Sequence, residues 1–313
     1  MLSYSWSVKS LTMSNGLREA AEMLDRNVVQ RVRQRRQSGV LQRDGSLIFV
    51  VFTEPVSMRA IVRTRDELFT RTVAQRAHSF DIVVNGNYFG VTRGGMLDAF
   101  VGHDSVAASE TIVQGQVVQA GQPTIGDSRP QRFFLAEIVE QGTGSRPGRL
   151  RYVTGFGNPP SGARTVTALG NLGPLLSGGL PYGQGNRYRP GTRGPATGDP
   201  GPRARGNLVQ RNDATFASVE KLGATTGKTV VAYHHREEAL LVGVQPHGRS
   251  PGQSYSRLRD ALGIAGFSDA VFLDGSDSAM LWHRGRCIVE PGEDKNELMT
   301  VGLGFVRRAS ARR

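Results

Sequence analysis

The sequence is poor in cysteine and in long apolar runs. Its single cysteine, Cys287, rules out a disulfide within the chain, and no Cys/His spacing indicates a structural zinc site. No apolar run approaches the ~20 residues that a membrane-spanning helix needs, so we expect no transmembrane segment. Residues 1–15 also lack the apolar core and the cleavage site of a signal peptide. We therefore expect a cytoplasmic protein, or one exported by a non-classical or specialised secretion route, as an effector or toxin would be.

Acidic residues are in short supply as well. Lysine and arginine number 39 against 27 aspartate and glutamate residues, which gives a formal net charge of +12. Such a charge attracts nucleic acid or small anionic ligands. The densest basic cluster, Arg31, Arg33, Arg35 and Arg36, ends a segment at 17–37 in which apolar residues recur every three or four positions. This spacing favours an amphipathic helix packed on the domain, and we keep nucleic-acid binding through this helix only as an alternative.

The rest of the chain predicts an α+β fold, with a mixed β-sheet core flanked by helices. Strands are predicted at 46–53, 57–64 and 80–85, and a helix at 65–77. Glycine and proline are dense from residue 155 to 206, which indicates a flap or an insertion.

The length of 313 residues suits one elaborated domain with a sizeable core. We expect a basic amphipathic helical extension at 1–40, a main domain at 41–308 and a basic tail at 309–313. The main domain contains the Gly/Pro-rich flap or insertion, placed at 181–213. The oligomeric state does not follow from the sequence.

The most informative stretch follows a strand predicted at 270–273. Two carboxylates and two hydroxyls surround a glycine there, at Asp274, Gly275, Ser276, Asp277 and Ser278, and apolar residues then resume. We call residues 274–278 the elbow. The glycine permits a tight turn, so the polar side chains converge at the strand end, where they can hold a sugar, a phosphate or a cation. An ordinary turn has the same composition, and this alternative stays open.

Three further segments combine strand residues with glycine and polar side chains. The first contains an Asn-Gly pair, which also favours a tight hairpin, and the last is a strand, turn, strand hairpin. They are residues 83–90 with Asn85, Asn87 and Tyr88, residues 168–179 with Gly178 and Gly179, and residues 227–244 with Lys228 and Thr229.

The order of these segments resembles that of the phosphodiester glycosidase family. The match spans roughly 46–306, where 252–266 resembles the family's helix, 268–281 its Asp-Gly-Gly-Gly-Ser signature and 296–305 its closing strand. Ser276 and Asp277 depart from the family by replacing glycines, and Lys228 stands where arginine is common. The resemblance implies a glycosidase-type hydrolase that cleaves the bond between the anomeric carbon of a sugar and a phosphate.

The resemblance also implies a role for each polar segment. Asp274 and Asp277 are the expected catalytic pair, because glycoside hydrolysis usually needs two carboxyl groups. Lys228 and the backbone at Gly178 and Gly179 are expected to stabilise the phosphate leaving group. The substrate is then an anionic sugar phosphate or a glycan that carries one. The other residues expected to bind it are Asn85, Asn87, Tyr88, Thr229, Ser276 and Ser278.

Other readings of the same residues stay open. The hydrolysis requires no cofactor, but Asp274 and Asp277 can instead bind Ca²⁺ or Mg²⁺ through their oxygen atoms. A non-catalytic protein that binds an anionic sugar or a nucleotide can use the same cleft. Histidines such as His247 lie in turns where exposure is the default, and Cys287 is expected to be buried rather than nucleophilic.

Overall fold

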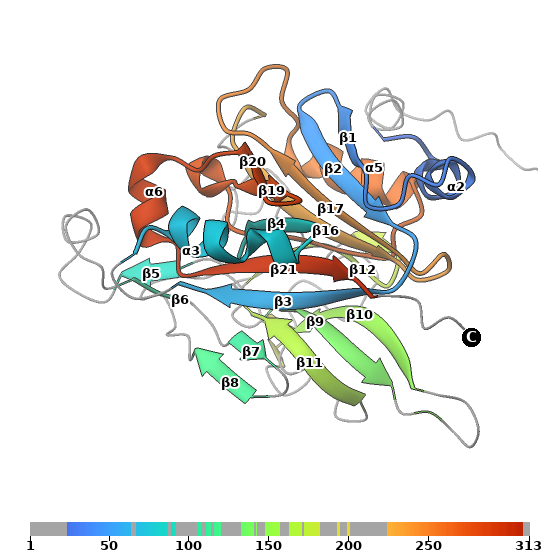
Figure 1. Ribbon diagram of the computed structural model, residues 1–313. Coiled ribbons are helices and arrows are strands. Elements are labelled where there is room, and N and C mark those ends of the chain that lie inside the picture. Colours follow the sequence, from blue (N-terminus) through green and yellow to red (C-terminus); the bar gives the residue numbers. More distant parts are fainter. Residues whose placement is uncertain are drawn as a thin grey trace, which may run out of the picture.

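The computed structural model describes residues 24–63, 67–86, 89–91, 105–107, 111–113, 116–119, 133–140, 142, 148–156, 163–170, 172–181, 193–194, 199–200 and 224–308. The predicted α+β class is confirmed, and every strand pair among these residues is antiparallel (Figure 1). Most of the predicted flap at 181–213, and Asn87 and Tyr88, lie outside the described residues.

The largest sheet has seven strands and carries the elbow at the end of one of them. All residues of β2, β16 and β17 are buried, so both faces of this sheet are covered. In spatial order its strands are β1 (Leu41–Asp44), β2 (Leu47–Phe52), β17 (Ala239–Gln245), β16 (Lys228–His234), β18 (Asp269–Phe272), β12 (Gly173–Ser177) and β13 (Leu180–Pro181).

Two five-stranded sheets complete the body of the molecule, and we name them by a central strand. The β4 sheet has the order β20 (Arg286–Val289), β19 (Leu281–His283), β4 (Ile82–Asn85), β21 (Val301–Arg307) and β3 (Val56–Val62). The β9 sheet has the order β10 (Arg149–Phe156), β9 (Phe133–Glu140), β11 (Ala163–Leu169), β7 (Thr111–Val113) and β8 (Gln116–Gln119). Two short pairs also form, β5 (Phe89–Val91) with β6 (Ser105–Ala107), and β14 (Arg193–Gly194) with β15 (Asp199–Pro200).

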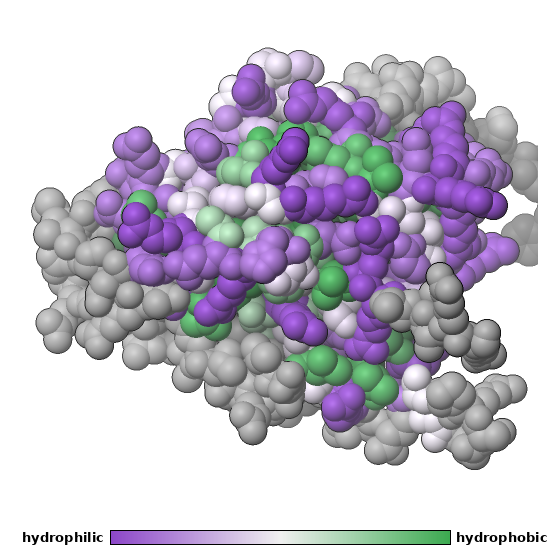
Figure 2. Space-filling view, in the orientation of Figure 1, coloured by the Kyte–Doolittle hydropathy of each residue, from purple (hydrophilic) through white to green (hydrophobic). Residues whose placement is uncertain are grey.

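The helices are short and lie around these sheets (Figure 1). They are α2 (Val28–Gln34), α3 (Phe69–Arg76), α5 (Tyr255–Ile264) and α6 (Glu293–Leu298), with 3₁₀ turns η1 (Ala77–Ser79) and η3 (Ser276–Ser278). Apolar residues of α2, α5, the seven-stranded sheet and the β4 sheet form one core. The described surface in Figure 2 is mainly hydrophilic, with small separate apolar patches. In the described part of the chain, no helix is both long and apolar enough to cross a membrane.

Most predicted elements are found close to their expected positions. Strands β2, β3 and β4, helix α3, the β16–β17 hairpin and helix α5 lie within the ranges predicted for them, apart from shifts of a few residues at some ends. The closing strand predicted at 296–305 is wrong in its first half, which is helix α6. Glu293 and Asp294 lie in the first turn of α6, where acidic side chains favour a helix, and β21 begins only at Val301.

The N-terminal helix is packed into the main core rather than standing apart from it. Only the part from residue 24 onward is described, and it contains α2. Leu24, Val28, Val29 and Val32 are each at most 1% exposed and belong to the same core as β2. The packed amphipathic helix is thus confirmed for this part, while the division of the chain at residue 40 stays a prediction.

Candidate functional site

The elbow lies where the seven-stranded sheet meets the end of β4. Strands β16 and β18 pair with Val230 opposite Phe272, and the N–H of Leu273 donates to the Thr229 carbonyl over 2.9 Å. Continuing this register places Lys228 beside Asp274, because directly opposite residues in an antiparallel pair are close neighbours. The N–H of Asp274 donates to the carbonyl of Gly86, just after β4, over 3.0 Å. Two sheets therefore hold the backbone of Asp274, the first residue of the elbow.

The elbow itself depends on two close glycine contacts. The Gly275 N–H donates to the Asp274 carboxylate over 3.0 Å, and the Ser276 N–H donates to the Gly227 carbonyl over 2.8 Å. A Cβ on Gly227 would lie 2.0 Å from the Ser276 carbonyl oxygen, so only glycine fits there. Ser276 has φ of 58°, the left-handed conformation that favours glycine. The glycine that the family resemblance predicts at this position suits the observed backbone, although the chain has serine.

Asn85 connects the strands around the elbow. Its side chain is 1% exposed, and its amide nitrogen donates to the Asp274 carbonyl over 2.5 Å. Its amide oxygen accepts from the Thr229 hydroxyl at 2.6 Å and from the Met280 N–H at 3.1 Å. Both lone pairs of that oxygen are thereby used within the protein. Asn85 and Thr229 hold the elbow in place, and their use as ligands for a substrate stays a prediction.

Lys228 is a buried cation at the start of β16. It is 1% exposed, and its ammonium group donates to the carbonyls of Thr226 at 2.7 Å and Ala224 at 3.3 Å. The same group lies 5.1 Å from the centre of the Tyr255 ring, within cation–π range. Burial of an ammonium is costly unless carbonyls or charges surround it, as they do here. Lys228 is therefore a buried cation on the strand that neighbours the start of the elbow.

A cavity of about 530 Å³ opens on one side of the elbow. Its wall includes Asp277, together with Arg43, His247 and Arg249. The Asp277 carboxylate is 41% exposed and lies 4.0 Å from the Lys295 ammonium of α6. The His247 ring is fixed because its Nδ1 accepts from the Gly227 N–H over 3.3 Å. We call this the elbow cavity; it combines the carboxylates of Asp277 and Glu290 with a basic wall.

The structure brings together most, but not all, of the predicted site residues. Asn85, Lys228 and Thr229 lie around the elbow, and Ser278 is buried inside it. Asp277 lines the elbow cavity, whereas Asp274 is not among its lining residues.

The structure places Gly178 and Gly179 away from the elbow. They form the exposed turn between β12 and β13, with φ of 59° and 82°. The Gly179 N–H donates to Ser268, at the opposite end of β18 from Asp274. The glycines serve a tight hairpin turn, and the length of β18 separates them from the elbow.

Three basic residues of the cavity were missed by the sequence reading. Arg43 comes from β1, and His247 and Arg249 come from the loop after β17. The sequence of that loop, Pro-His-Gly-Arg, predicts an exposed turn, and no pattern in the sequence predicts that it lies close to the elbow.

Two further predictions concern metal and thiol chemistry. Within the described residues no group of three His, Cys, Asp or Glu side chains gathers as metal ligands would, so cation binding by Asp274 and Asp277 stays a prediction. Cys287 is partly buried, and burial together with the charge of Glu290 raises the pKa of its thiol to about 11. It is therefore a protonated, weakly nucleophilic thiol at neutral pH, as expected.

Comparisons with known proteins give only distant structural likenesses. No family model and no curated protein matches the chain. The catalytic domain of zebrafish N-acetylglucosamine-1-phosphodiester alpha-N-acetylglucosaminidase, auto-inhibited by its pro-peptide, is similar over 84% of this chain and 76% of that one, with 15% identity and a TM-score of 0.48. A hypothetical protein from Synechocystis matches 84% of this chain and 59% of its own, with 13% identity and a TM-score of 0.40. A protein from Burkholderia pseudomallei described as exported matches 83% and 73%, with 12% identity and a TM-score of 0.44.

Proposed function

We propose that this chain is a hydrolase that cleaves a glycosyl phosphodiester, or a related anionic glycoside, in the elbow cavity. The observation that carries the proposal is the cavity wall, where the carboxylate of Asp277 shares one space with Arg43, His247 and Arg249. Guanidinium groups bind phosphate through paired hydrogen bonds, and a carboxylate can accept a proton from water. The order of polar segments that resembles the phosphodiester glycosidases supports the same substrate class.

The reaction needs one base and a cationic site for the leaving group. A water molecule forms a bond to the anomeric carbon and gives its proton to the carboxylate of Asp277. The bond between that carbon and the phosphate oxygen breaks, and its electron pair leaves with the phosphate. Arg43 and Arg249 stabilise the negative charge that remains there. Because a phosphate is a good leaving group, the second carboxyl group that glycosidases usually use as an acid is less needed.

Asp274, Asn85 and Lys228 act as positioning residues in this proposal. Asp274 is the first residue of the elbow, and its carbonyl is held by the Asn85 amide. The Lys228 ammonium lies on the neighbouring strand and is buried. Together they fix the start of the elbow, and η3 then presents Asp277 to the cavity. Their substitution is expected to disturb the geometry of the site rather than to remove a group that touches substrate.

The test is turnover of a sugar linked through its anomeric carbon to a phosphodiester, measured as release of the free sugar. We expect Asp277→Asn to lower kcat about 10²–10⁴-fold with a small change in KM, the usual loss on removing a base. We expect Arg43→Gln and Arg249→Gln each to lower kcat/KM about tenfold, with part of the loss in kcat, since a charge-assisted bond that stabilises the departing phosphate is lost. Glu290→Gln is the matched control, because Glu290 lines the same cavity and has no assigned role. Turnover by Asp277→Asn equal to that of the unaltered chain would overturn the catalytic assignment.

A non-catalytic binder of an anionic sugar or nucleotide is the second candidate. It is favoured by one observation, that Asp277 lines the cavity while Asp274 does not. In that case the unaltered chain binds a sugar phosphate without turnover, and Asp277→Asn binds it more tightly because a repulsive charge is removed. Isothermal titration with a sugar 1-phosphate, repeated with EDTA and with added Ca²⁺ or Mg²⁺, separates this outcome from hydrolysis. The same titration tests the cation site at Asp274 and Asp277.

A further inference from the structure

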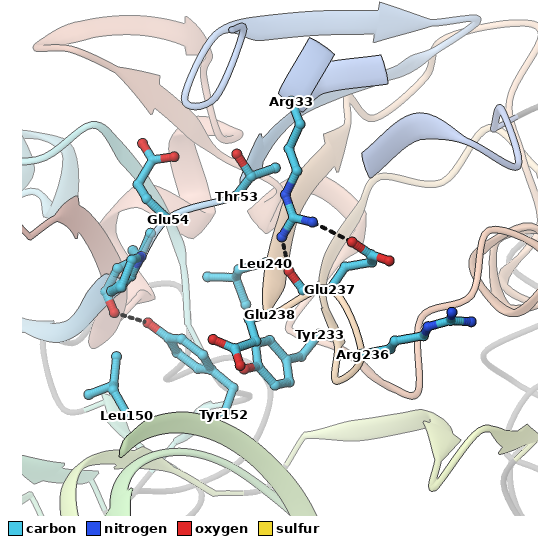
Figure 3. A pocket seen from close by; sticks show the side chains of 12 residues that line it. Arg33, Thr53, Glu54, Leu150, Tyr152, Tyr233, Arg236, Glu237, Glu238 and Leu240 are labelled. Carbon is cyan, nitrogen blue, oxygen red and sulfur yellow. Dashed lines mark hydrogen bonds and ion pairs between the residues drawn. The ribbon is translucent and has the colours of Figure 1, made fainter. Parts of the chain in front are cut away.

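A second cavity, of about 300 Å³, lies at the far end of the seven-stranded sheet (Figure 3). It is formed where the β16–β17 turn faces β10, the β2–β3 turn and α2. Tyr233 lines it near the end of β16, whereas Lys228 lies at the start of the same strand. The two cavities share none of their described lining residues. We call the second one the tyrosine cavity.

Two tyrosine rings form its floor. Tyr152 and Tyr233 have ring centres 5.5 Å apart and planes inclined by 53°, and Leu150 and Leu240 extend the apolar surface beside them (Figure 3). The Tyr152 hydroxyl donates to the Val56 carbonyl over 2.9 Å, which fixes that ring. The floor is thus a rigid, apolar and aromatic surface.

The Tyr233 hydroxyl differs from that of Tyr152. Tyr233 is 5% exposed and lines the cavity, and among the described residues its hydroxyl makes no hydrogen bond. Burial raises the pKa of Tyr233, so the group stays protonated and able to donate. The hydroxyl oxygen is not one of the fully buried polar atoms, so it is accessible from the cavity, where it can donate to a ligand or to water.

The rim supplies acceptors and donors with balanced charge. Glu237 is paired with Arg33, Glu54 lies 3.7 Å from Arg307, and Glu238 is paired with Arg149. Glu54 and Glu238 remain partly exposed, with 33% and 48% of their side chains accessible. Each carboxylate keeps free lone pairs for further hydrogen bonds. Each of the three carboxylates is paired with an arginine, so the rim carries little net charge. It therefore favours polar ligands that are themselves uncharged.

We propose that the tyrosine cavity binds the ring of a neutral sugar residue. The C–H groups on one side of a sugar ring pack against aromatic rings, and its hydroxyls donate to carboxylates such as Glu54 and Glu238. The Tyr233 hydroxyl donates to an oxygen of the same sugar. An anionic ligand meets three carboxylates here, and a cationic one meets Arg33 and Arg236. The volume is at the lower end for ligand pockets and suits one ring rather than a long chain.

This site does not depend on hydrolysis in the elbow cavity. It would hold a neutral part of a glycan about one strand length from the elbow, or a free sugar. The two proposals fail separately, because one concerns turnover of a phosphodiester and the other concerns affinity for an uncharged sugar.

The test uses the full chain and the methyl glycosides of neutral hexoses and N-acetylhexosamines, titrated by NMR and calorimetry. We expect one of them to bind with Kd on the order of 1 mM, as is reasonable for a single small ring. We expect Tyr233→Phe to weaken binding about fivefold, the usual effect of one lost hydrogen bond, and Glu54→Gln about three- to tenfold. Glu290→Gln is the control, because Glu290 lines only the elbow cavity, and affinity for the neutral sugar should stay within about twofold.

Three results would overturn the proposal. In the first, no neutral sugar binds at concentrations of about 20 mM, well above the expected Kd. In the second, a sugar binds but Tyr233→Phe and Glu54→Gln leave its affinity unchanged. In the third, a hexose phosphate or an amino sugar binds this cavity more tightly than the neutral glycoside, which would assign the site to a charged ligand.

Discussion

At the residue scale, the site depends on positions that have no side chain. Gly227 and Gly275 let the start of β16 and the elbow approach each other closely. A Cβ on Gly275 would lie 2.7 Å from both the Gly227 carbonyl oxygen and the Tyr255 hydroxyl. The sequence indicated a tight turn at Gly275, but it gave no sign that Gly227, 48 residues earlier, is its packing partner. When a glycine is required because a distant segment packs against it, the neighbouring sequence contains no pattern that predicts the contact.

We predict that Gly227→Ala destabilises the protein and displaces the elbow. The new Cβ would lie 2.0 Å from the Ser276 carbonyl oxygen, so the backbone must shift, at a cost of roughly 2 kcal/mol or more. Urea unfolding measures the loss, and phosphodiester turnover should fall with it. Gly263→Ala is the control, since its nearest neighbour, Leu176 Cδ2, is 3.8 Å away. Gly263 lies in α5, where alanine should stabilise by about 0.5–1 kcal/mol. Equal stability of the two variants would contradict the proposed contact.

At the element scale, strands with strong apolar patterns were predictable and contacts between sheets were not. The β16–β17 hairpin was predicted from its two apolar runs, which are buried along their whole length. The Gly178–Gly179 turn was assigned to the site because glycines suit both phosphate loops and hairpins, and a sequence does not distinguish these uses. The contact of β4 with the elbow depends on Asn85, whose buried hydrogen bonds join three distant segments. Such long-range pairing is specified by the assembled fold.

The position of β4 depends on an ion pair at its start. Arg307, at the end of β21, donates to the Asp81 carboxylate through its backbone N–H at 2.9 Å and through its guanidinium at 3.0 and 2.7 Å. Burial alone would raise the pKa of Asp81, but these hydrogen bonds and the charge of Arg307 outweigh it, so the pKa is lowered. This pair anchors the strand that ends at Asn85.

We predict that Asp81 contributes stability at neutral pH that is lost in acid. Because the pKa is lower in the folded state, the contribution is complete above the unfolded value of about 3.9 and disappears as pH falls through the folded pKa. Asp81→Asn should lower the free energy of unfolding by roughly 1–3 kcal/mol at pH 7, the usual range for a hydrogen bond to a charged group. Urea unfolding from pH 7 down to pH 3 measures both effects. Asp294→Asn, which alters an exposed carboxylate on α6, is the control. A difference between Asp81→Asn and the unaltered chain that persists undiminished at the lowest pH would count against the ion pair.

At the scale of the whole molecule, the charge of +12 does not produce a free basic arm in the described residues. Of the four arginines in the basic cluster, Arg31 is paired with Asp25 at 2.5 Å and Arg33 with Glu237. The opposite side of α2 is part of the core. The helix therefore belongs to the folded body, and two of its four clustered arginines are used in ion pairs with the rest of the chain.

We predict that deletion of residues 1–37 unfolds the protein, so such a deletion cannot report on nucleic-acid binding by this segment. The deletion removes Leu24, Val28, Val29 and Val32 from the core, at about 1.5–3 kcal/mol for each larger side chain. That sum approaches the whole stability of a typical domain, about 5–15 kcal/mol. Thermal unfolding monitored by circular dichroism should show no cooperative transition in the deleted chain. A transition close to that of the full chain would contradict the packing of α2.

Nucleic-acid binding by the basic cluster is tested by Arg35→Gln combined with Arg36→Gly. Glycine suits the second position because Arg36 has φ of 53°, which glycine adopts easily. It should keep the fold and bind duplex DNA within about twofold of the unaltered chain. A tenfold loss, with a salt dependence reduced by about one unit for each arginine, would instead show that α2 contacts phosphates.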